Sequence, residues 1–302
     1  MHAAAEPVPP PSPGEDAAPR FPVHAWRPAL RLLATGAQVL SAGNLLYLVA
    51  RSLLGLLEGL DPPSPLQLVL QLVAFSLLPQ GLVWLLQRFT AATLDIERAS
   101  ARLVLQLRGV RFEIPLESVT GVEPWKLPLP GSGLTLRMKS GRRFEYHLQA
   151  AAPASLLTAL GASLPAAAAA ADHPGSRLGQ ARHDWRRRLW DTPAIKFGLF
   201  PLLPTGIMFR AHQYITFGGP LGEYDMFGLA AYLRTFALYW VSFTTGLLLY
   251  AGFWRILAEL LAFALTWLVP SGARGFRLAA EWLCRLAYYV AFPALVAWRF
   301  LG

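Results

Sequence analysis

The side chains best suited to chemistry gather in one stretch of the second half of the chain. Thirteen residues separate Lys196 from Arg210, and Pro201, Pro204 and Gly206 interrupt the apolar residues between them. Membrane segments broken in this way often line binding sites, because the freed backbone groups need partners. Ionisable side chains of both signs follow within the 16 residues that start at Arg210. The sequence therefore predicts a polar membrane site, for proton handling or anion binding, formed by Lys196, Arg210, His212, Glu223 and Asp225.

A purely structural explanation fits the same residues. Arg210 would extend its charge to the headgroup region, His212 would hydrogen-bond a carbonyl group, and the carboxylates would cap the following helix. Asp225 stands directly before an apolar stretch, as N-cap residues do. Both explanations stay open at the level of sequence.

Two further pairs of opposite charge have helical spacing. Arg255 and Glu259 are four residues apart, as are Glu281 and Arg285, so each pair could form an ion pair on one helix face. Charges inside a membrane segment are costly unless they are paired or face a wet interior. These pairs indicate either adhesion between helices or a polar path through the bundle that includes Arg234.

No sequence motif assigns a reaction. The chain has no nucleophile elbow, zinc-protease motif, Walker A loop or dinucleotide-binding glycine fingerprint. Its single cysteine, Cys284, cannot form an intrachain disulfide and lacks the spacing of a metal site. We therefore expect no catalytic residue, no bound metal and no cofactor.

Membrane helices are the elements expected to position these residues. Of the 302 residues, 54% are hydrophobic and 15% are charged, whereas soluble domains carry about 25% charged residues. The apolar residues stand in long blocks. The formal net charge of +9 lies largely in arginine-rich flanks, which indicates membrane topology rather than nucleic-acid binding. Five spans are expected, over residues 32–50, 66–87, 195–217, 226–254 and 278–298. Residues 256–270 are short for a full crossing, so they extend the preceding helix, lie in the interface or form a sixth span.

Residues 89–163 break this pattern with period-two alternation of polar and apolar side chains. In "LTLRMKSGRRFEYHL", residues 134–148, this alternation stands on both sides of a Ser140-Gly141 turn and predicts a β-hairpin. A helix follows at the end of the region. The fold class is therefore mixed: a multi-pass α-helical membrane bundle with an inserted small antiparallel β-barrel or sandwich that folds by itself.

The predicted organisation has five parts. They are a disordered Pro/Ala-rich N-terminus over residues 1–28, a transmembrane hairpin over 29–88, the β-domain with its C-terminal helix over 89–163, an Ala/Arg-rich linker over 164–193 and a C-terminal bundle of three or four helices over 194–302.

A family resemblance accompanies this organisation. A membrane hairpin followed by "VRFEIPLESVTGVEP", a strand–turn–strand and a helix resembles bacterial membrane proteins with a PH-like domain. In that family a strand runs into an "IPL..I..V" segment, matched here by Ile114, Pro115, Leu116, Val119 and Val122. The resemblance covers residues 30–163, and the second half of the chain has no counterpart in it. It implies a PH-like domain that binds through loops and strand edges, without fixing the ligand.

Basic residues set the expected orientation. Arginines precede the first span, whereas the loops after the first and third spans carry acidic residues and no Lys or Arg. The protein is expected in a bacterial inner membrane. Because cytoplasmic loops are enriched in Lys and Arg, its N-terminus and β-domain are expected on the cytoplasmic side. Two basic clusters, at the hairpin tip and before the third span, are candidates for contact with anionic lipid headgroups: Arg142, Arg143, Arg186, Arg187 and Arg188. The second cluster is equally explained as a topology signal.

Together these features predict an interaction protein, acting as a scaffold or accessory subunit of a membrane complex with lipid headgroup contact. The expected partners are the lipid bilayer and either a membrane protein or a second copy of this chain, without nucleic acid. The alternative is a membrane enzyme or transporter whose polar site is formed by the Pro/Gly-broken segment 196–225.

Overall fold

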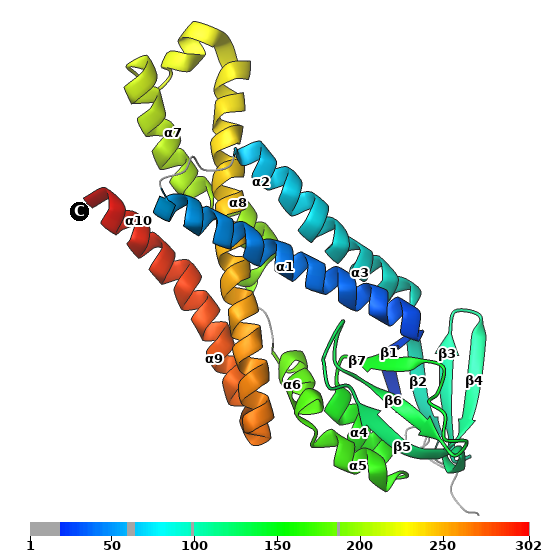
Figure 1. The fold of residues 1–302 in the computed structure, drawn as a ribbon. Helices are drawn as coiled ribbons and strands as arrows, with labels where there is room; N and C mark the ends of the chain where they lie inside the picture. Colours follow the sequence, from blue (N-terminus) through cyan, green and yellow to red (C-terminus); the bar gives the residue numbers. More distant parts are fainter. Residues whose placement is uncertain (1–18, 59–63, 98–99, 186–187, 302) are drawn as a thin grey trace, which may run out of the picture.

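Three long apolar helices dominate the computed structural model, and a curled β-sheet lies at one end of them (Figure 1). The structure describes residues 19–58, 64–97, 100–185 and 188–301. Within these residues, three helices are long and apolar enough to cross a membrane: Pro28–Gly55, Pro65–Phe89 and Gly222–Leu268. The chain thus joins three helices of membrane-spanning length and hydropathy to a β-domain, and the mixed fold class that its sequence predicts is present.

The first two of these helices form an antiparallel pair. Helix α1 spans Pro28–Glu58, and its partner is a continuous helix composed of α2 (Pro65–Leu72), a π-helical turn η1 (Val73–Leu77) and α3 (Leu78–Phe89). Polar side chains join the pair at mid-length. Asn44 donates from Nδ2 to Oγ of Ser76 over 3.0 Å and accepts from Nε2 of Gln71 over 3.2 Å. The weakly polar residues of the first span therefore mediate helix contact, as small and polar residues do in membranes.

Each π-helical turn in the described residues ends two positions before a proline. Turn η1 precedes Pro79, η4 (Ala194–Leu199) precedes Pro201, and η6 (Ala287–Ala291) precedes Pro293. Proline lacks an N–H group and its ring clashes with the carbonyl group four residues earlier, so a helix that continues through it needs a wider turn. The helix passes Pro79 in this form.

The C-terminal half is a helical bundle built around one very long helix. It contains α7 (Leu202–Phe217), α8 (Gly222–Leu268), α9 (Ala273–Leu286) and α10 (Phe292–Leu301). Of the three alternatives left open for residues 256–270, the structure shows the first, because α8 continues to Leu268. The expected spans at 195–217 and 278–298 are helical but divided, and neither contains a single α-helix of spanning length and hydropathy.

Helix α8 is longer than a hydrocarbon core is thick. Residues 229–268, which follow a break at Gly228, extend over about 60 Å at 1.5 Å per residue, against a core of about 30 Å. Near its start Gly228 has φ 80° and ψ 176°, a conformation open in practice only to glycine, which folds the first turns back on the rest. One end of α8 meets α7, and the other lies beside α6 (Pro174–His183) and α9 (Figure 1).

The β-domain is a single antiparallel sheet with the strand order β4-β3-β2-β1-β7-β6-β5. Its strands are β1 (Arg20–Trp26), β2 (Ala91–Glu97), β3 (Arg102–Leu107), β4 (Val110–Pro115), β5 (Val119–Pro124), β6 (Gly133–Met138) and β7 (His147–Ala150). The apolar face of the curled sheet is covered by helix α4 (Pro153–Gly161), through Leu156, Leu157 and Leu160. The predicted β-domain with a C-terminal helix is therefore present.

The expected disordered N-terminus is wrong for residues 20–26, which form β1 at the centre of the sheet. Val23 pairs with Ala92 of β2 on one side and with Ala150 of β7 on the other. The helical pair α1–α3 is thus inserted between two neighbouring strands of the domain. Residues 1–18 lie outside the described part of the chain.

The two strands continue almost without interruption into the two helices. Only Arg27 separates β1 from α1, and only Thr90 separates α3 from β2. Trp26 is fully buried between them and donates its indole N–H to Oε1 of Gln149 over 2.8 Å. It packs in a small core with Ala34, Ala37, Val83 and Trp125. The β-domain is therefore fixed rigidly to the helical pair.

The expected linker over residues 164–193 is largely part of the β-domain. Its polyalanine run forms α5 (Pro165–Ala171), whose Ala167 and Ala170 lie in the same core as the sheet and α4. Helix α6 then packs so closely on the domain that a Cβ at Gly179 would lie 2.5 Å from the side chain of Ser132. Alanine favours helix intrinsically, but here burial of its methyl groups holds the segment in place.

The hairpin over residues 134–148 is confirmed, with a shorter second strand than its alternation predicts. Strands β6 and β7 pair Leu134 with Leu148, while β7 begins only at His147. A bridge between Arg137 and Arg143 and a turn at Gly141, where φ is +77°, close the tip.

Three histidines of this domain are held in environments that favour their neutral form. Burial lowers the pKa of His24. Burial, followed by the charges of Arg31 and Arg143, lowers the pKa of His147. Burial and Lys126 lower the pKa of His173, whose Nδ1 accepts a hydrogen bond from the backbone N–H of Gly175 at the start of α6. Protonation at this last atom would break the helix cap.

The missing central strand predicts how fragments behave. Residues 90–163 alone lack β1 and α5, so β2 and β7 would each lose a partner and the core would be open; we expect a random-coil circular dichroism spectrum. Residues 20–27 joined by a short Asn-Gly turn to residues 90–183 should instead give a cooperative β-sheet transition, because Ala25 already hydrogen-bonds to Thr90. A folded 90–163 fragment would contradict the role assigned to β1.

The histidine environments predict a pH dependence. Since the three pKa values are below the ordinary 6.5 in the folded chain, the unfolded chain takes up protons first as the pH falls. Stability is therefore complete above pH 6.5 and decreases as the pH falls through 6.5 towards the lowered values. Thermal unfolding in detergent should occur at a lower temperature at pH 5.5 than at pH 7.5.

His173→Asn should reduce this difference, because asparagine retains the helix cap without titrating in this range. His183→Asn, at an exposed position, is the matched control. Equal pH dependence in wild type and His173→Asn would show that His173 does not contribute.

Candidate functional site

The five residues of the predicted polar site do not come together. Lys196 lies in η4, Arg210 and His212 lie in the second half of α7, and Glu223 and Asp225 begin α8. Within the described residues, no hydrogen bond or ion pair joins any two of them. Arg210 is exposed and reaches Tyr214, and His212 contacts Thr216 one helical turn away.

Glu223 has a structural environment that its sequence neighbours do not reveal. Its side chain is buried, and it accepts hydrogen bonds from Nε2 of Gln213 and Oγ1 of Thr235, each over 2.6 Å. Gln213, which is fully buried, also accepts from the backbone N–H of Glu223 over 3.2 Å. This clamp holds α7 and α8 together across their turn and across the break at Gly228. Asp225 is exposed and makes no contact with the clamp.

A group of ion-paired side chains lies instead where α6, α8 and α9 meet, and two of its members, Arg277 and Glu281, are buried. Glu259 of α8 accepts from Arg182 of α6 over 2.6 Å, from Arg255 of its own helix over 2.8 Å, and from Arg277 of α9. Glu281 of α9 accepts from Arg255 over 2.7 Å and from Arg277. We call these five residues the ion-pair cluster. It holds three guanidinium groups against two carboxylates and joins three helices.

Sequence spacing predicted one of the two intrahelical pairs correctly. The pair between Arg255 and Glu259 is present. The expected pair between Glu281 and Arg285 is not, because Glu281 faces Arg277 and Arg255, while Arg285 binds Asp191. Nη2 and Nε of Arg285 donate to the same Asp191 oxygen over 2.5 and 3.0 Å. Asp191 belongs to the short 3₁₀ turn η3 (Leu189–Asp191), which precedes η4.

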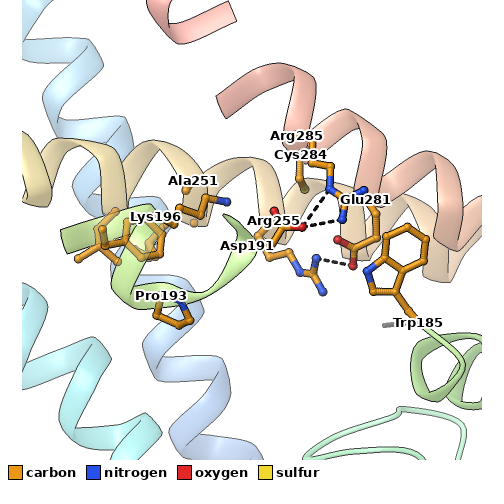
Figure 2. A pocket seen from close by; sticks show the side chains of 13 residues that line it. Trp185, Asp191, Pro193, Lys196, Ala251, Arg255, Glu281, Cys284 and Arg285 are labelled. Atoms are coloured by element: carbon orange, nitrogen blue, oxygen red, sulfur yellow. Dashed lines mark hydrogen bonds and ion pairs between the residues drawn. The ribbon is translucent and has the colours of Figure 1, made fainter. Parts of the chain in front are cut away.

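A cavity of about 320 Å³ adjoins the ion-pair cluster. Its walls come from α8, α9, Leu45 of α1, Trp185, and side chains between Asp191 and Phe197. Figure 2 shows Lys196 on one side and the Asp191–Arg285 and Arg255–Glu281 pairs on the other. The volume is at the lower end of the range for ligand pockets, about 300–1,000 Å³. Charged side chains and apolar helix surface therefore share one concave site.

No protein-family model, curated protein or solved structure matches this chain. The function is therefore argued from the cavity, the cluster and the attachment of the β-domain.

A second, more apolar cavity of about 590 Å³ lies on the other side of Arg255. It is lined by α1, α3, α8 and the loop residues 127–129, with Arg182 and Glu259 at its polar end. Arg255 thus lies between two cavities and belongs to both.

The basic residues predicted to contact lipid have mixed surroundings. Arg142 and Arg188 are exposed. Arg143 forms an ion pair with Glu123 over 2.9 Å, so part of the charge of the hairpin tip is neutralised within the domain. Arg186 and Arg187 lie outside the described residues. Lipid contact at these positions stays a prediction.

Of the predicted site, only Lys196 lies in the cavity, and the sequence analysis did not identify its most informative companions. Neither Asp191 nor Arg277 is singled out by the sequence. The signal for Arg277 was its spacing of four residues from Glu281. The contacts of Asp191 and Arg182 join segments far apart in the chain, which no local pattern indicates.

The ion-pair cluster makes a prediction for stability. Glu259→Gln would remove the carboxylate that Arg182 binds and leave Arg255 and Arg277 sharing Glu281. Removing one member of a buried ion pair costs about 3 kcal/mol of unfolding free energy. Glu113→Gln removes an exposed ion pair on the sheet and should cost less than about 1 kcal/mol. Thermal or denaturant unfolding of both variants in the same detergent measures the difference. Equal stability of the two would contradict a structural role for the cluster.

Proposed function

We propose that this chain is a multi-pass bacterial inner-membrane protein whose PH-like β-domain acts at the cytoplasmic surface, as a scaffold or accessory subunit of a membrane complex. The observation that carries this proposal is the direct continuation of β1 and β2 into α1 and α3. A domain attached through two neighbouring strands cannot rotate freely on the membrane. Such an attachment suits a surface that must be presented in one orientation to a partner.

The architecture of the domain supports the PH-like part of the proposal. A curled antiparallel sheet with a helix after its last strand is what the resemblance over residues 30–163 implies. The matched "IPL" segment ends β4 and begins the 3₁₀ turn η2 (Leu116–Ser118) that leads to β5. Ile114, Leu116, Val119 and Val122 all contribute to the core. The matched positions are therefore apolar because their side chains pack in the core of the β-domain.

The edge of the sheet offers a plausible contact surface. Strand β4 lies at one edge of the sheet and pairs only with β3. An edge strand presents backbone N–H and C=O groups that another chain can bind by adding a strand. Val110, at the start of β4, is 51% exposed. We assign partner contact to this edge.

The alternative, an enzyme or transporter with its site in residues 196–225, has weaker support. Lys196 lies before α7, away from the other four residues near the α7–α8 turn. Glu223 is occupied by the clamp with Gln213 and Thr235. That region has a sufficient explanation as a helix–helix connection.

Site-specific photo-crosslinking of the full chain in cells tests the proposal. A photoreactive amino acid at Val110 should give a discrete crosslinked product with a membrane protein, identified by mass spectrometry. The same amino acid at the exposed Arg210, at the far end of α7, should give no such product. Crosslinks to protein at Arg210 and none at Val110 would reject the β-domain as the contact surface and favour the alternative.

A further inference from the structure

The charge of the 320 Å³ cavity is unbalanced towards positive. Three cationic side chains line it, Lys196, Arg255 and Arg285, against two carboxylates, those of Asp191 and Glu281. Both carboxylates are already engaged. Asp191 binds Arg285, and Glu281 binds Arg255 together with Arg277 of the cluster.

Lys196 carries the unmatched charge. Within the described residues, no carboxylate lies within ion-pairing distance of its ammonium group, although the side chain is half-buried. Its Nζ lies 4.4 Å from the ring centroid of Tyr288 and 5.6 Å from that of Phe197. Aromatic rings compensate a cation only in part. A half-buried ammonium group beside a cavity is therefore best matched by an anion inside the cavity.

The rim of the cavity indicates the kind of anion. The guanidinium carbon of Arg285 lies 5.2 Å from the ring of Trp185 and 5.6 Å from that of Trp282. Trp190, next to Asp191, is 63% exposed, and its carbonyl group accepts a hydrogen bond from Tyr289. Tryptophan and tyrosine concentrate at the level of lipid headgroups, and basic pockets between helices on the cytoplasmic side bind anionic headgroups. Apolar residues, among them Leu45, Leu248 and Ala251, complete the walls.

We propose that this cavity binds the phosphate headgroup of an anionic phospholipid, with Lys196 as the principal counter-ion. An anionic lipid brings the single negative charge that the cavity lacks, whereas a zwitterionic lipid brings a phosphate together with its own cation. Arg255 and Arg285 hold the positive potential of the cavity while remaining bound to their carboxylates. The site is separate from the surface basic residues of the hairpin tip, and it does not depend on the proposed role of the β-domain.

The test measures lipid-dependent stabilisation of the full chain. Purified protein in detergent is titrated with phosphatidylglycerol, with phosphatidylcholine, and with inorganic phosphate, and thermal unfolding and native mass spectrometry are recorded for each. Phosphatidylglycerol should raise the unfolding temperature and remain bound in the mass spectrum, and phosphatidylcholine should do neither. Equal effects of the two lipids would overturn the proposal. Full reproduction of the effect by inorganic phosphate would assign the site to a soluble phosphate compound and overturn the lipid source.

Variants connect the effect to the cavity. Lys196→Gln should weaken phosphatidylglycerol binding about five-fold, since one basic residue near anionic lipid contributes about that factor, and Lys196→Arg should restore it. Arg210→Gln is the matched control, because it removes a cation in the second half of α7, which does not line the cavity. Ala251→Leu fills the cavity without changing its charge and should also lose binding, which keeps the test valid if Lys196→Gln folds poorly. Unchanged binding in both Lys196→Gln and Ala251→Leu would reject the site.

Discussion

The structure depends on the junction at which two paired strands become two packed helices. Neighbouring strands lie about 4.8 Å apart, whereas packed helices lie about 8–10 Å apart, so the two elements must diverge as they leave the sheet. Trp26 fills the space that this divergence opens, and alanines at positions 34 and 37 leave room for its ring. Around it, the guanidinium group of Arg31 lies 3.6 Å from the ring centroid of Trp125. Because this junction is packed and hydrogen-bonded, the position of the sheet follows from the direction of α1 and α3.

A second attachment holds the β-domain from its other side, and it is electrostatic. Helix α6 packs against the domain through Gly179 and reaches α8 through the ion pair of Arg182 with Glu259. A further ion pair joins Asp184 and Arg274 over 3.5 Å. Buried charges gain little net stability over apolar packing, because their desolvation is costly. Their geometry is demanding, however, since each guanidinium group needs acceptors in its own plane. The cluster therefore restricts α6, α8 and α9 to one relative placement, and this effect is larger than its net contribution to the free energy of unfolding.

The sequence predicted those features that a local pattern can show. Hydropathy located the helical pair α1–α3 and the long helix α8, and period-two alternation located the strands from β2 to β7. Strand β1 was not recognised, because its partners, β2 and β7, follow only after an inserted helical pair. The polyalanine of α5 was assigned to a linker because alanine methyl groups reveal their burial only in the folded core. At the site, Arg277 and Arg285 are both four residues from Glu281, so spacing alone allows either to pair with it. Arg285 instead binds Asp191, which is ninety-four residues away in the chain, and Arg277 pairs with Glu281.

Arg255 links the attachment through α6 to the proposed lipid site. It lines the cavity, and it shares Glu259 with Arg182, the residue that joins α6 to α8. A phosphate group near Arg255 would supply part of the negative charge that this guanidinium group now takes from Glu259. Glu259 would then interact more strongly with Arg182, and the ion pair that joins α6 to α8 would become stronger. By linkage, a β-domain held firmly through α6 would favour the phosphate in return. This coupling is positive because the cluster has more guanidinium groups than carboxylates, so an added anion reduces the competition of the guanidinium groups for the carboxylates. An anionic lipid of the membrane would in this way help to hold the β-domain in place.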